Sequence, residues 1–315
     1  MLSIVARRLS CTADARVKEK DWMNGVIVVD KPAGWTSHDA VNKLRRLART
    51  KKVGHLGTLD PAATGVLPLI LGRATRLAQF YAASDKVYDA VVQFGWATDT
   101  YDRDGQIVGA KRDLELDPNK VESLLERFRG KIRQMPPPIS AKKIGGTPAY
   151  KLARRNLPVE LKPVEVTVYS IELVSCAGAE ARIRVHCSAG TYLRSIAHDL
   201  GQAYGCGAYL ESLVRTRAAD FTLEQARSIE ELERLAREGR LEEALIPAAQ
   251  LLPELPSQIV DALTAGQIRQ GRDFRASPFR ARKDVPYIKA LSENGELIAI
   301  GRALLPNVYH PVIVL

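Results

Sequence analysis

Strand-type and helix-type segments are intermixed along this chain of 315 residues, and their order limits the available folds more than any other feature. Short β-branched or alternating apolar runs predict strands at 26–29, 87–94, 164–174 and 181–187. Apolar residues at helical spacing predict helices over 36–47, 74–81, 118–128, 191–204 and 227–243. These segments do not follow the regular βαβ alternation of a doubly wound fold. The order therefore predicts an α+β fold with a mixed, mainly antiparallel sheet flanked by helices and loops.

The chain changes character near residue 246, where several prolines follow within a short stretch. Beyond them, apolar runs predict further strands at 287–291, 297–304 and 312–315. The first two of these strands are joined by an Asn-Gly pair, which is typical of a tight hairpin. We therefore expect a main domain over 23–245 and a small β-rich domain over 246–315.

Simple patterns exclude or disfavour several classes of protein. The longest apolar stretches, such as 65–71, are far shorter than the ~20 residues of a membrane span. We expect residues 1–22 to form a disordered tail. A secretory signal is disfavoured, because the apolar run 2–6 is too short for one. The four cysteines contain no CxxC pair and the five histidines no HxxxH pair. We therefore expect no metal site, and reduced thiols in a cytoplasmic protein.

Positive charge is concentrated in two stretches of the chain. Lys and Arg total 46 against 36 Asp and Glu, which gives a formal net charge of +10. Residues 40–59 contain six Lys or Arg and residues 131–155 contain seven, and neither stretch contains an acidic residue. Either stretch alone fits a solvated loop, but the two together favour contacts with nucleic-acid phosphates. Tyr150 adds a stacking surface to the second stretch.

A single carboxylate, Asp60, stands in a segment rich in Gly, Pro and Thr at 51–67, which predicts a loop. The nearest acidic residues in the sequence are Asp39 and Asp85. Such isolation argues against a metal site, which needs several oxygen ligands, and against the paired carboxylates of a glycosidase. It fits a lone carboxylate that serves as nucleophile or base among basic side chains.

Five motifs of this sequence resemble those of the TruB-type tRNA pseudouridine synthases. They lie in the family's order at 29–38, 57–68, 85–88, 136–142 and 187–196, within a resemblance that runs from about residue 24 to 221. The resemblance implies a pseudouridine synthase fold, an RNA-clasping insert at about 131–156 and a PUA-like RNA-binding domain at the carboxyl end. It also implies that the protein converts uridine to pseudouridine at position 55, in the T loop of tRNA.

The resemblance further implies roles for particular side chains. Asp60 corresponds to the essential aspartate and Arg194 to the basic residue that pairs with it. Tyr88 corresponds to the tyrosine that stacks on the target uracil and is implicated in handling its C5 proton. Substrate-binding or supporting roles are expected of His55, Tyr192, Leu213, Lys31, Lys142 and Tyr150. The isomerisation needs no redox agent and no hydrolytic water, so no cofactor is expected.

The chemical route and a second function stay open on the sequence alone. Asp60 can attack C1′ of the sugar, add to C6 of the base, or remove the 2′ proton. The alternative function is a tRNA-binding folding helper that acts independently of catalysis. The guide-RNA-dependent branch of the superfamily is disfavoured, because the small carboxy-terminal domain and the basic insert indicate stand-alone recognition. We expect a monomer that binds the T arm of tRNA, without DNA, membrane or guide RNA.

Overall fold

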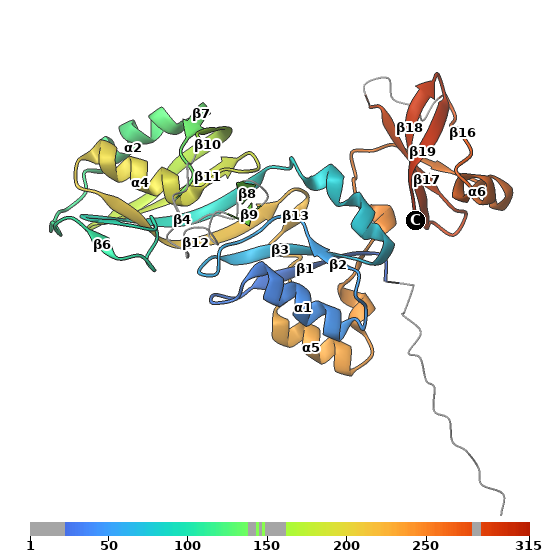
Figure 1. Cartoon of the computed structure of the whole chain (residues 1–315), viewed down its shortest axis with the longest axis horizontal. Helices are drawn as coiled ribbons and strands as arrows, with labels where there is room; N and C mark the ends of the chain where they lie inside the picture. The colour runs from blue at the N-terminus through green and yellow to red at the C-terminus, as the bar shows by residue number, and fades with distance from the viewer. Residues whose placement is uncertain (1–22, 138–142, 145–146, 149–161, 279–284) are drawn as a thin grey trace, which may run out of the picture.

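The computed structural model describes residues 23–137, 143–144, 147–148, 162–278 and 285–315 (Figure 1). The predicted tail at 1–22 lies outside the described residues, and so does most of the predicted insert, including Lys142 and Tyr150. Within the described residues, no helix is both long enough and apolar enough to cross a lipid bilayer.

The main part of the molecule is built on one ten-stranded sheet. Eight of its strands follow one another in the spatial order β14 (Ile246–Pro247), β1 (Gly25–Lys31), β3 (Thr64–Leu71), β12 (Ala208–Ala218), β4 (Lys86–Phe94), β11 (Glu180–Cys187), β10 (Val164–Ala177) and β7 (Gly130–Gln134). The other two strands lie off this path: β2 (Val53–His55) pairs with β3, and β13 (Phe221–Thr222) pairs with β12. Among the described strands of this sheet, β12 and β3 pair in parallel and the other pairs are antiparallel. The predicted mixed, mainly antiparallel sheet is confirmed.

Helices flank both ends of this sheet. They are α1 (Ser37–Leu47), α2 (Pro118–Leu125), α4 (Leu193–Tyr204) and α5 (Ile229–Arg237), with 3₁₀ segments at η1 (Gly72–Tyr81), η2 (Glu126–Phe128), η3 (Leu241–Ala244) and η4 (Ala248–Gln250). Figure 1 shows α1 and α5 together beside β1–β3, and α2 and α4 together at the opposite end of the sheet. The predicted helix over 74–81 is a 3₁₀ segment, and those over 36–47, 118–128 and 191–204 are confirmed within a few residues. The predicted helix over 227–243 ends at Arg237, and the 3₁₀ segment η3 follows it.

Local sequence explains where α1 begins. Thr36 accepts a hydrogen bond from the Asp39 backbone N–H at 3.1 Å, and the Asp39 carboxylate accepts one from the Thr36 backbone N–H at 2.9 Å. This reciprocal capping box satisfies two amide groups that the first helical turn leaves unpaired. Val41 and Leu44 then face the core, as their helical spacing predicts.

Strand β1 divides the core into two layers because its side chains alternate between the faces of the sheet. Ile27 and Val29 belong to the cluster that contains the buried residues of α1, α2, α4 and α5. Val26 and Val28 pack on the opposite face with residues of η1 and of the carboxy-terminal sheet. The β1–β3 end of the main sheet is thus covered on both faces.

The carboxy-terminal part forms a second, five-stranded sheet. Its strands are β15 (Ser257–Ile259), β17 (Tyr287–Leu291), β18 (Leu297–Leu305), β19 (Val308–Val314) and β16 (Phe274–Arg275), with α6 (Ala262–Arg269) packed beside them. The predicted hairpin is confirmed between β17 and β18, where Gly295 adopts a φ of +78°. The last strand begins at Val308, earlier than predicted, because it pairs along most of β18. The domain boundary at 246 stays a prediction.

Two parts of the main sheet differ from the sequence prediction. The segment 51–67 is not entirely a loop, since it contains β2 and the start of β3, and β2 pairs with the end of β3 at 69–71. Strand β12 occupies the middle of the sheet but was not predicted. Its polar residues, such as Ser212, Arg215 and Arg217, interrupt the alternation that would have identified it.

Candidate active site

Asp60 lies in the turn between β2 and β3, and a buried arginine of β12 holds this turn in place. Arg215 is 1% exposed, and its Nε donates to the carbonyl oxygen of Val66 at 2.7 Å. Its Nη1 and Nη2 donate to the carbonyl oxygens of Thr58 (3.3 Å) and Gly57 (3.0 Å). The planar guanidinium can serve several carbonyl groups at once because its donors point in different directions. Arg215 therefore fixes the backbone on both sides of Asp60.

Lys31 supports the same turn from the end of β1. Its side chain is fully buried, and its Nζ donates to the carbonyl oxygens of Pro32 (2.8 Å), Trp35 (2.7 Å) and Pro61 (3.2 Å). Burial lowers the pKa of Lys31 to about 8, although the nearby Asp60 carboxylate raises it. Three carbonyl acceptors thus hold an ammonium group that has lost its water.

Two residues further along the chain, Gly34 and Ser37, support the same turn. The backbone N–H of Gly34 donates to the carbonyl oxygen of Pro61 at 2.9 Å. The hydroxyl of Ser37, in the first turn of α1, accepts a hydrogen bond from the Leu59 backbone N–H at 2.9 Å. The segment that leads from β1 into α1 therefore holds both neighbours of Asp60.

One guanidinium contacts two carboxylates at the centre of the site. Nε of Arg194 lies 2.9 Å from Oδ2 of Asp60, and its Nη1 lies 3.4 Å from Oδ2 of Asp102. The Arg194 side chain is 7% exposed, whereas that of Asp60 is 46% exposed. Burial raises the pKa of Asp102, while a Thr100 hydrogen bond and the Arg194 charge lower it. Asp60 thus has a buried cationic partner, while its own carboxylate is exposed enough for a substrate to reach.

Asp102 was not predicted as a site residue. Its signal in the sequence is the acidic run at 99–105, which carries three aspartates in a short loop between β5 (Ala97–Thr98) and β6 (Ile107–Val108). Only the contact with Arg194 distinguishes Asp102 from its exposed neighbours. Arg215 was missed for a similar reason, because β12 itself was not predicted.

Tyr88 is buried on β4, opposite Arg215 of β12 in the register of the two strands. Burial raises the pKa of Tyr88, and the Arg215 charge and a side-chain hydrogen bond between the two residues lower it. The negative charge of Asp60 also raises this pKa, so the two side chains lie within electrostatic reach of each other. Tyr88, Arg215 and Asp60 thus belong to one site.

Two further residues of the resemblance, Tyr192 and Leu213, lie on elements that carry Arg194 and Arg215. The backbone of Tyr192, just before α4, exchanges two hydrogen bonds with the Gln134 side chain, at 2.8 and 2.9 Å. Leu213 lies opposite Ala90 on β4 and packs, partly buried, against the main core. Gln134 therefore fixes the backbone from which the helix of Arg194 begins.

His55 lies at the end of β2, on the chain that leads to Asp60. Its Nδ1 accepts a hydrogen bond from the Gly57 backbone N–H at 3.3 Å. Burial lowers the pKa of His55, and the positive charges of Arg215 and His38 lower it further. The neutral ring is the form that can accept this hydrogen bond.

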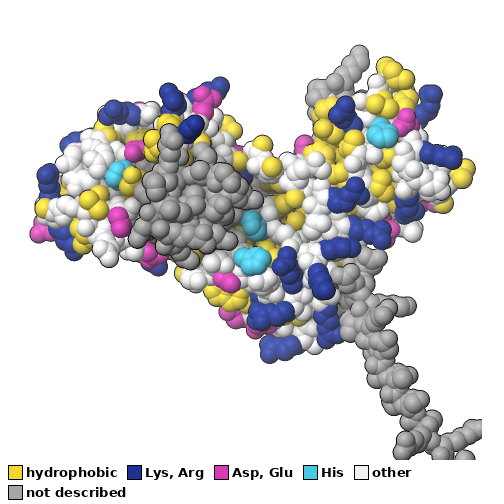
Figure 2. Space-filling model, in the orientation of Figure 1, with side chains coloured by type: hydrophobic (Ala, Val, Ile, Leu, Met, Phe, Trp, Pro, Cys, Tyr) yellow, Lys and Arg dark blue, Asp and Glu magenta, His cyan; other side chains and the backbone are white. Residues whose placement is uncertain are grey.

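Basic side chains gather on one face of the molecule near α1 and β2 (Figure 2). Arg46, at the end of α1, and Arg49, Lys51 and Lys52 in the chain that follows are exposed. In the described part of the chain, no three His, Cys, Asp or Glu side chains are arranged to hold a metal ion.

Solved structures with this fold have been described. The crystal structure of a Cbf5–Nop10–Gar1 complex is 27% identical, with a TM-score of 0.66, and the match covers 90% of this chain and 80% of that one. An H/ACA RNP bound to a substrate RNA containing 2′-deoxyuridine is 26% identical, with a TM-score of 0.67, covering 93% of this chain and 84% of that one. The family model described as "TruB family pseudouridylate synthase (N terminal domain)" matches residues 45–193. The fold and the family model therefore define a pseudouridine synthase.

Sequence comparison defines the family within this class. The model of the tRNA pseudouridylate synthase B C-terminal domain matches residues 194–253. The tRNA pseudouridine synthase B of Solibacter usitatus is 58% identical over 93% of this chain and 100% of the relative. That of Aquifex aeolicus is 40% identical over 89% of this chain and 95% of the relative. The chain belongs to the TruB family of tRNA pseudouridine synthases, and it is an isomerase that converts uridine in tRNA.

Proposed function

We propose that this protein isomerises the uridine at position 55, in the T loop of tRNA, and that Asp60 is the catalytic carboxylate. The observation that carries this proposal is the half-exposed Asp60 carboxylate held 2.9 Å from the buried Arg194 guanidinium. Such a site keeps a negative charge at a fixed place and leaves one side open to an RNA nucleotide.

The reaction balances without an added reagent. The N1–C1′ bond breaks, the detached uracil turns, C5 bonds to C1′, and the C5 proton is released while N1 takes up a proton. Asp60 can begin this sequence by attack at C1′, by addition to C6, or by removal of the 2′ proton. Tyr88 is buried beside Asp60, and we assign it contact with the turning base and help with the C5 proton.

The target base must leave the stacked T loop before it reaches Asp60. Base flipping costs a few kcal/mol, and stacking of one base on an aromatic ring returns roughly 1–3 kcal/mol. We assign substrate contacts to His55, Tyr192 and Leu213 around the pocket, to Lys142 and Tyr150 in the insert, and support of the catalytic turn to Lys31. The exposed cations of α1 and its following loop supply phosphate contacts.

The proposal includes the setting in which the enzyme works. We propose a cytoplasmic monomer that binds the T arm directly, with its carboxy-terminal sheet acting as a PUA-like RNA-binding domain and without guide RNA, DNA or membrane. The two relatives compared by sequence are tRNA enzymes that match nearly the full chain, whereas the Cbf5 structures are less similar in sequence.

A second candidate function is a tRNA folding helper that acts independently of catalysis. The basic surface near α1 favours it, because these cations lie outside the Asp60 site and can bind tRNA without it. The two functions are compatible in one protein. A variant that still binds tRNA but no longer isomerises uridine would separate the two functions.

Tritium release from tRNA labelled at uridine C5 tests the proposal. We expect the wild-type protein to release one equivalent per tRNA, and a transcript with cytidine at position 55 to release none. Asp60→Asn should bind tRNA normally and lose at least about 10³-fold in turnover, since the reaction depends on this carboxylate. Asp104→Asn, a change to an exposed carboxylate in the loop that carries Asp102, is the matched control. Release by Asp60→Asn at the wild-type rate contradicts the proposed mechanism, and release from the cytidine transcript contradicts the proposed position.

A further inference from the structure

The loop that carries Asp102 has an unusual backbone beside the active site. Tyr101, which directly precedes Asp102, adopts a φ of +65°. This left-handed conformation is unfavourable for a bulky residue and persists only where surrounding contacts impose it. Strained backbone next to a charged residue of the active site indicates that the loop is held in a particular shape.

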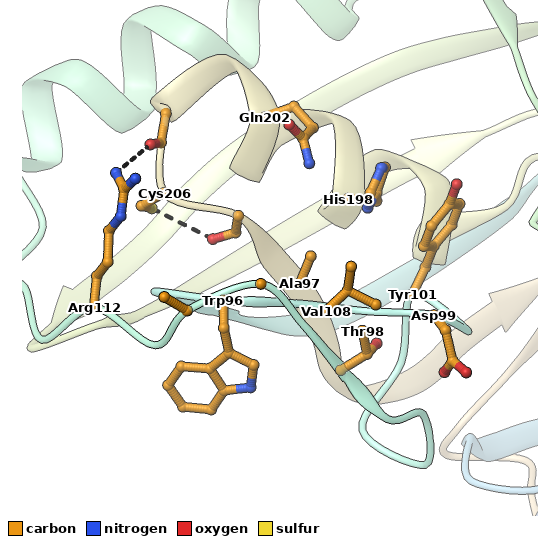
Figure 3. A pocket seen from close by; sticks show the side chains of 14 residues that line it. Trp96, Ala97, Thr98, Asp99, Tyr101, Val108, Arg112, His198, Gln202 and Cys206 are labelled. Carbon is orange, nitrogen blue, oxygen red and sulfur yellow. Dashed lines mark hydrogen bonds between the residues drawn. The ribbon is translucent and has the colours of Figure 1, made fainter.

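The ring of Tyr101 is stacked on the ring of His198. Their centroids lie 3.8 Å apart, and the two planes differ by 16°. Figure 3 shows the two side chains facing each other at one end of a cavity of about 570 Å³. His198 lies on α4, one helical turn after Arg194, so the helix that supplies the guanidinium also supplies the ring that holds the loop.

Backbone contacts hold the other side of the same loop. The carbonyl oxygen of Tyr101 accepts a hydrogen bond from the Leu210 backbone N–H of β12 at 2.9 Å. The Arg103 backbone N–H donates to the Leu210 carbonyl oxygen at 3.1 Å. Tyr101 is therefore fixed between β12, through its backbone, and α4, through its ring.

The residues on either side of Tyr101 both contact the catalytic guanidinium. Nη1 of Arg194 donates to the Thr100 carbonyl oxygen at 3.3 Å and lies 3.4 Å from the Asp102 carboxylate. A shift of Tyr101 moves these two acceptors together. We propose that the Tyr101–His198 stack is a positioning device that holds Thr100 and Asp102 against Arg194 and thereby sets where Arg194 presents its Nε to Asp60.

The surroundings of His198 favour a role for its ring in stacking. Among the described residues, no hydrogen-bond partner lies near its buried Nδ1. Burial lowers the pKa of His198, although Asp199 opposes this effect, so the neutral ring is favoured against Tyr101. A phenyl ring of similar size should therefore replace the imidazole, whereas a methyl group should not.

Single-turnover and steady-state kinetics on the position-55 substrate test this inference, which rests on the proposed function. We expect His198→Ala and Tyr101→Gly to lower kcat about tenfold or more with KM changed less than twofold, because a small displacement of a catalytic group costs rate and leaves binding intact. Tyr101→Gly removes the ring at a position where glycine accepts the positive φ, so a loss of kcat in this variant cannot come from a strained replacement residue. His198→Phe should retain most of the wild-type kcat. Gln202→Ala, on the next turn of α4 and lining the same cavity, is the matched control and should react like the wild type.

A double-mutant cycle with Asp102→Asn separates positioning from a general loss of stability. If the stack acts through Asp102, His198→Ala should lower kcat much less in the Asp102→Asn background than in the wild type. Equal losses in both backgrounds, or a wild-type kcat for His198→Ala, overturn the inference. A loss that disappears when the assay temperature is lowered well below the Tm of the variant also overturns it. A wild-type protein that fails to react at position 55 contradicts the proposed function instead.

Discussion

The ammonium group of Lys31 donates a hydrogen bond to the carbonyl oxygen of Pro61, the residue that directly follows Asp60. Strand β1 and the turn that carries Asp60 are distant in the sequence, and this contact joins them. The same ammonium serves the Pro32 and Trp35 carbonyls, so one buried charge organises two loops. Its protonation should therefore affect the stability of the fold around Asp60.

The lowered pKa of Lys31 predicts how the stability of the fold changes with pH. Its pKa is about 8 in the folded protein against 10.5 for an ordinary lysine, so between these values the unfolded chain binds more protons. The free energy of unfolding contributed by Lys31 should therefore rise as the pH increases from 8 to 10.5. Urea unfolding of the wild type and of Lys31→Met across this range measures the difference. Lys51→Met reports the effect of losing an exposed lysine, and Lys31→Arg provides a second comparison if Lys31→Met does not fold. If the difference in free energy of unfolding between the wild type and Lys31→Met falls with increasing pH, Lys31 does not have a lowered pKa in the folded protein.

Replacement of Arg215 should weaken both the fold and the reaction. Hydrogen bonds of charged groups contribute about 1.5–3 kcal/mol each, and lysine cannot reproduce the planar set of donors. We expect Arg215→Lys to lower the free energy of unfolding by about 3 kcal/mol and to lower kcat, as measured by urea unfolding and tritium release. Arg217→Lys, two residues later on β12 and in a partly exposed ion pair with Asp85, should cost at most about 1 kcal/mol. Equal effects of the two changes would show that the buried hydrogen bonds are unimportant.

Arg194 should matter more to the reaction than Asp102, its second acidic partner. Arg194→Lys keeps the charge but cannot contact two carboxylates in the same way, so we expect kcat to fall by about 10²-fold. Asp102→Asn keeps the Asp60 contact and should cost less. Binding of unreacted tRNA, measured by filter retention, should stay within about threefold for both variants, a small free-energy change. A larger loss for Asp102→Asn than for Arg194→Lys argues against this division of roles.

The exposed cations after α1 should determine the salt dependence of tRNA binding. Each phosphate contact contributes about 0.7–0.9 to the slope of log K against log salt. Replacing Arg49 and Lys51 together with glutamine should therefore reduce this slope by about 1–2 and leave kcat at saturating tRNA unchanged. Arg240→Gln removes an exposed cation that already pairs with Glu238 and Glu243, and it should leave the slope unchanged. An unchanged slope for the double variant removes this segment from the RNA-binding surface.

Much of the architecture could be predicted because its signals are local. The helix at 37–47 begins at a capping box that is complete within four residues, and the β17–β18 hairpin turns at an Asn-Gly pair. The strand at 86–94 alternates strictly between buried and half-buried side chains. The isolation of Asp60 in a glycine-rich segment, together with the family motifs, predicts this carboxylate as a site residue.

Only the tertiary structure decided which groups surround Asp60. Strand β12 could not be predicted, because the polar residues that interrupt its pattern include Arg215, which donates to the turn that carries Asp60. Asp102 and His198 likewise carry no motif, and their relation to Arg194 arises from the contact between a loop and a helix. Capping and alternation depend on near neighbours, so the amino-acid order determined them. Ion pairs, buried hydrogen bonds and ring stacking join residues far apart in the chain, and such contacts leave no periodic trace in the sequence.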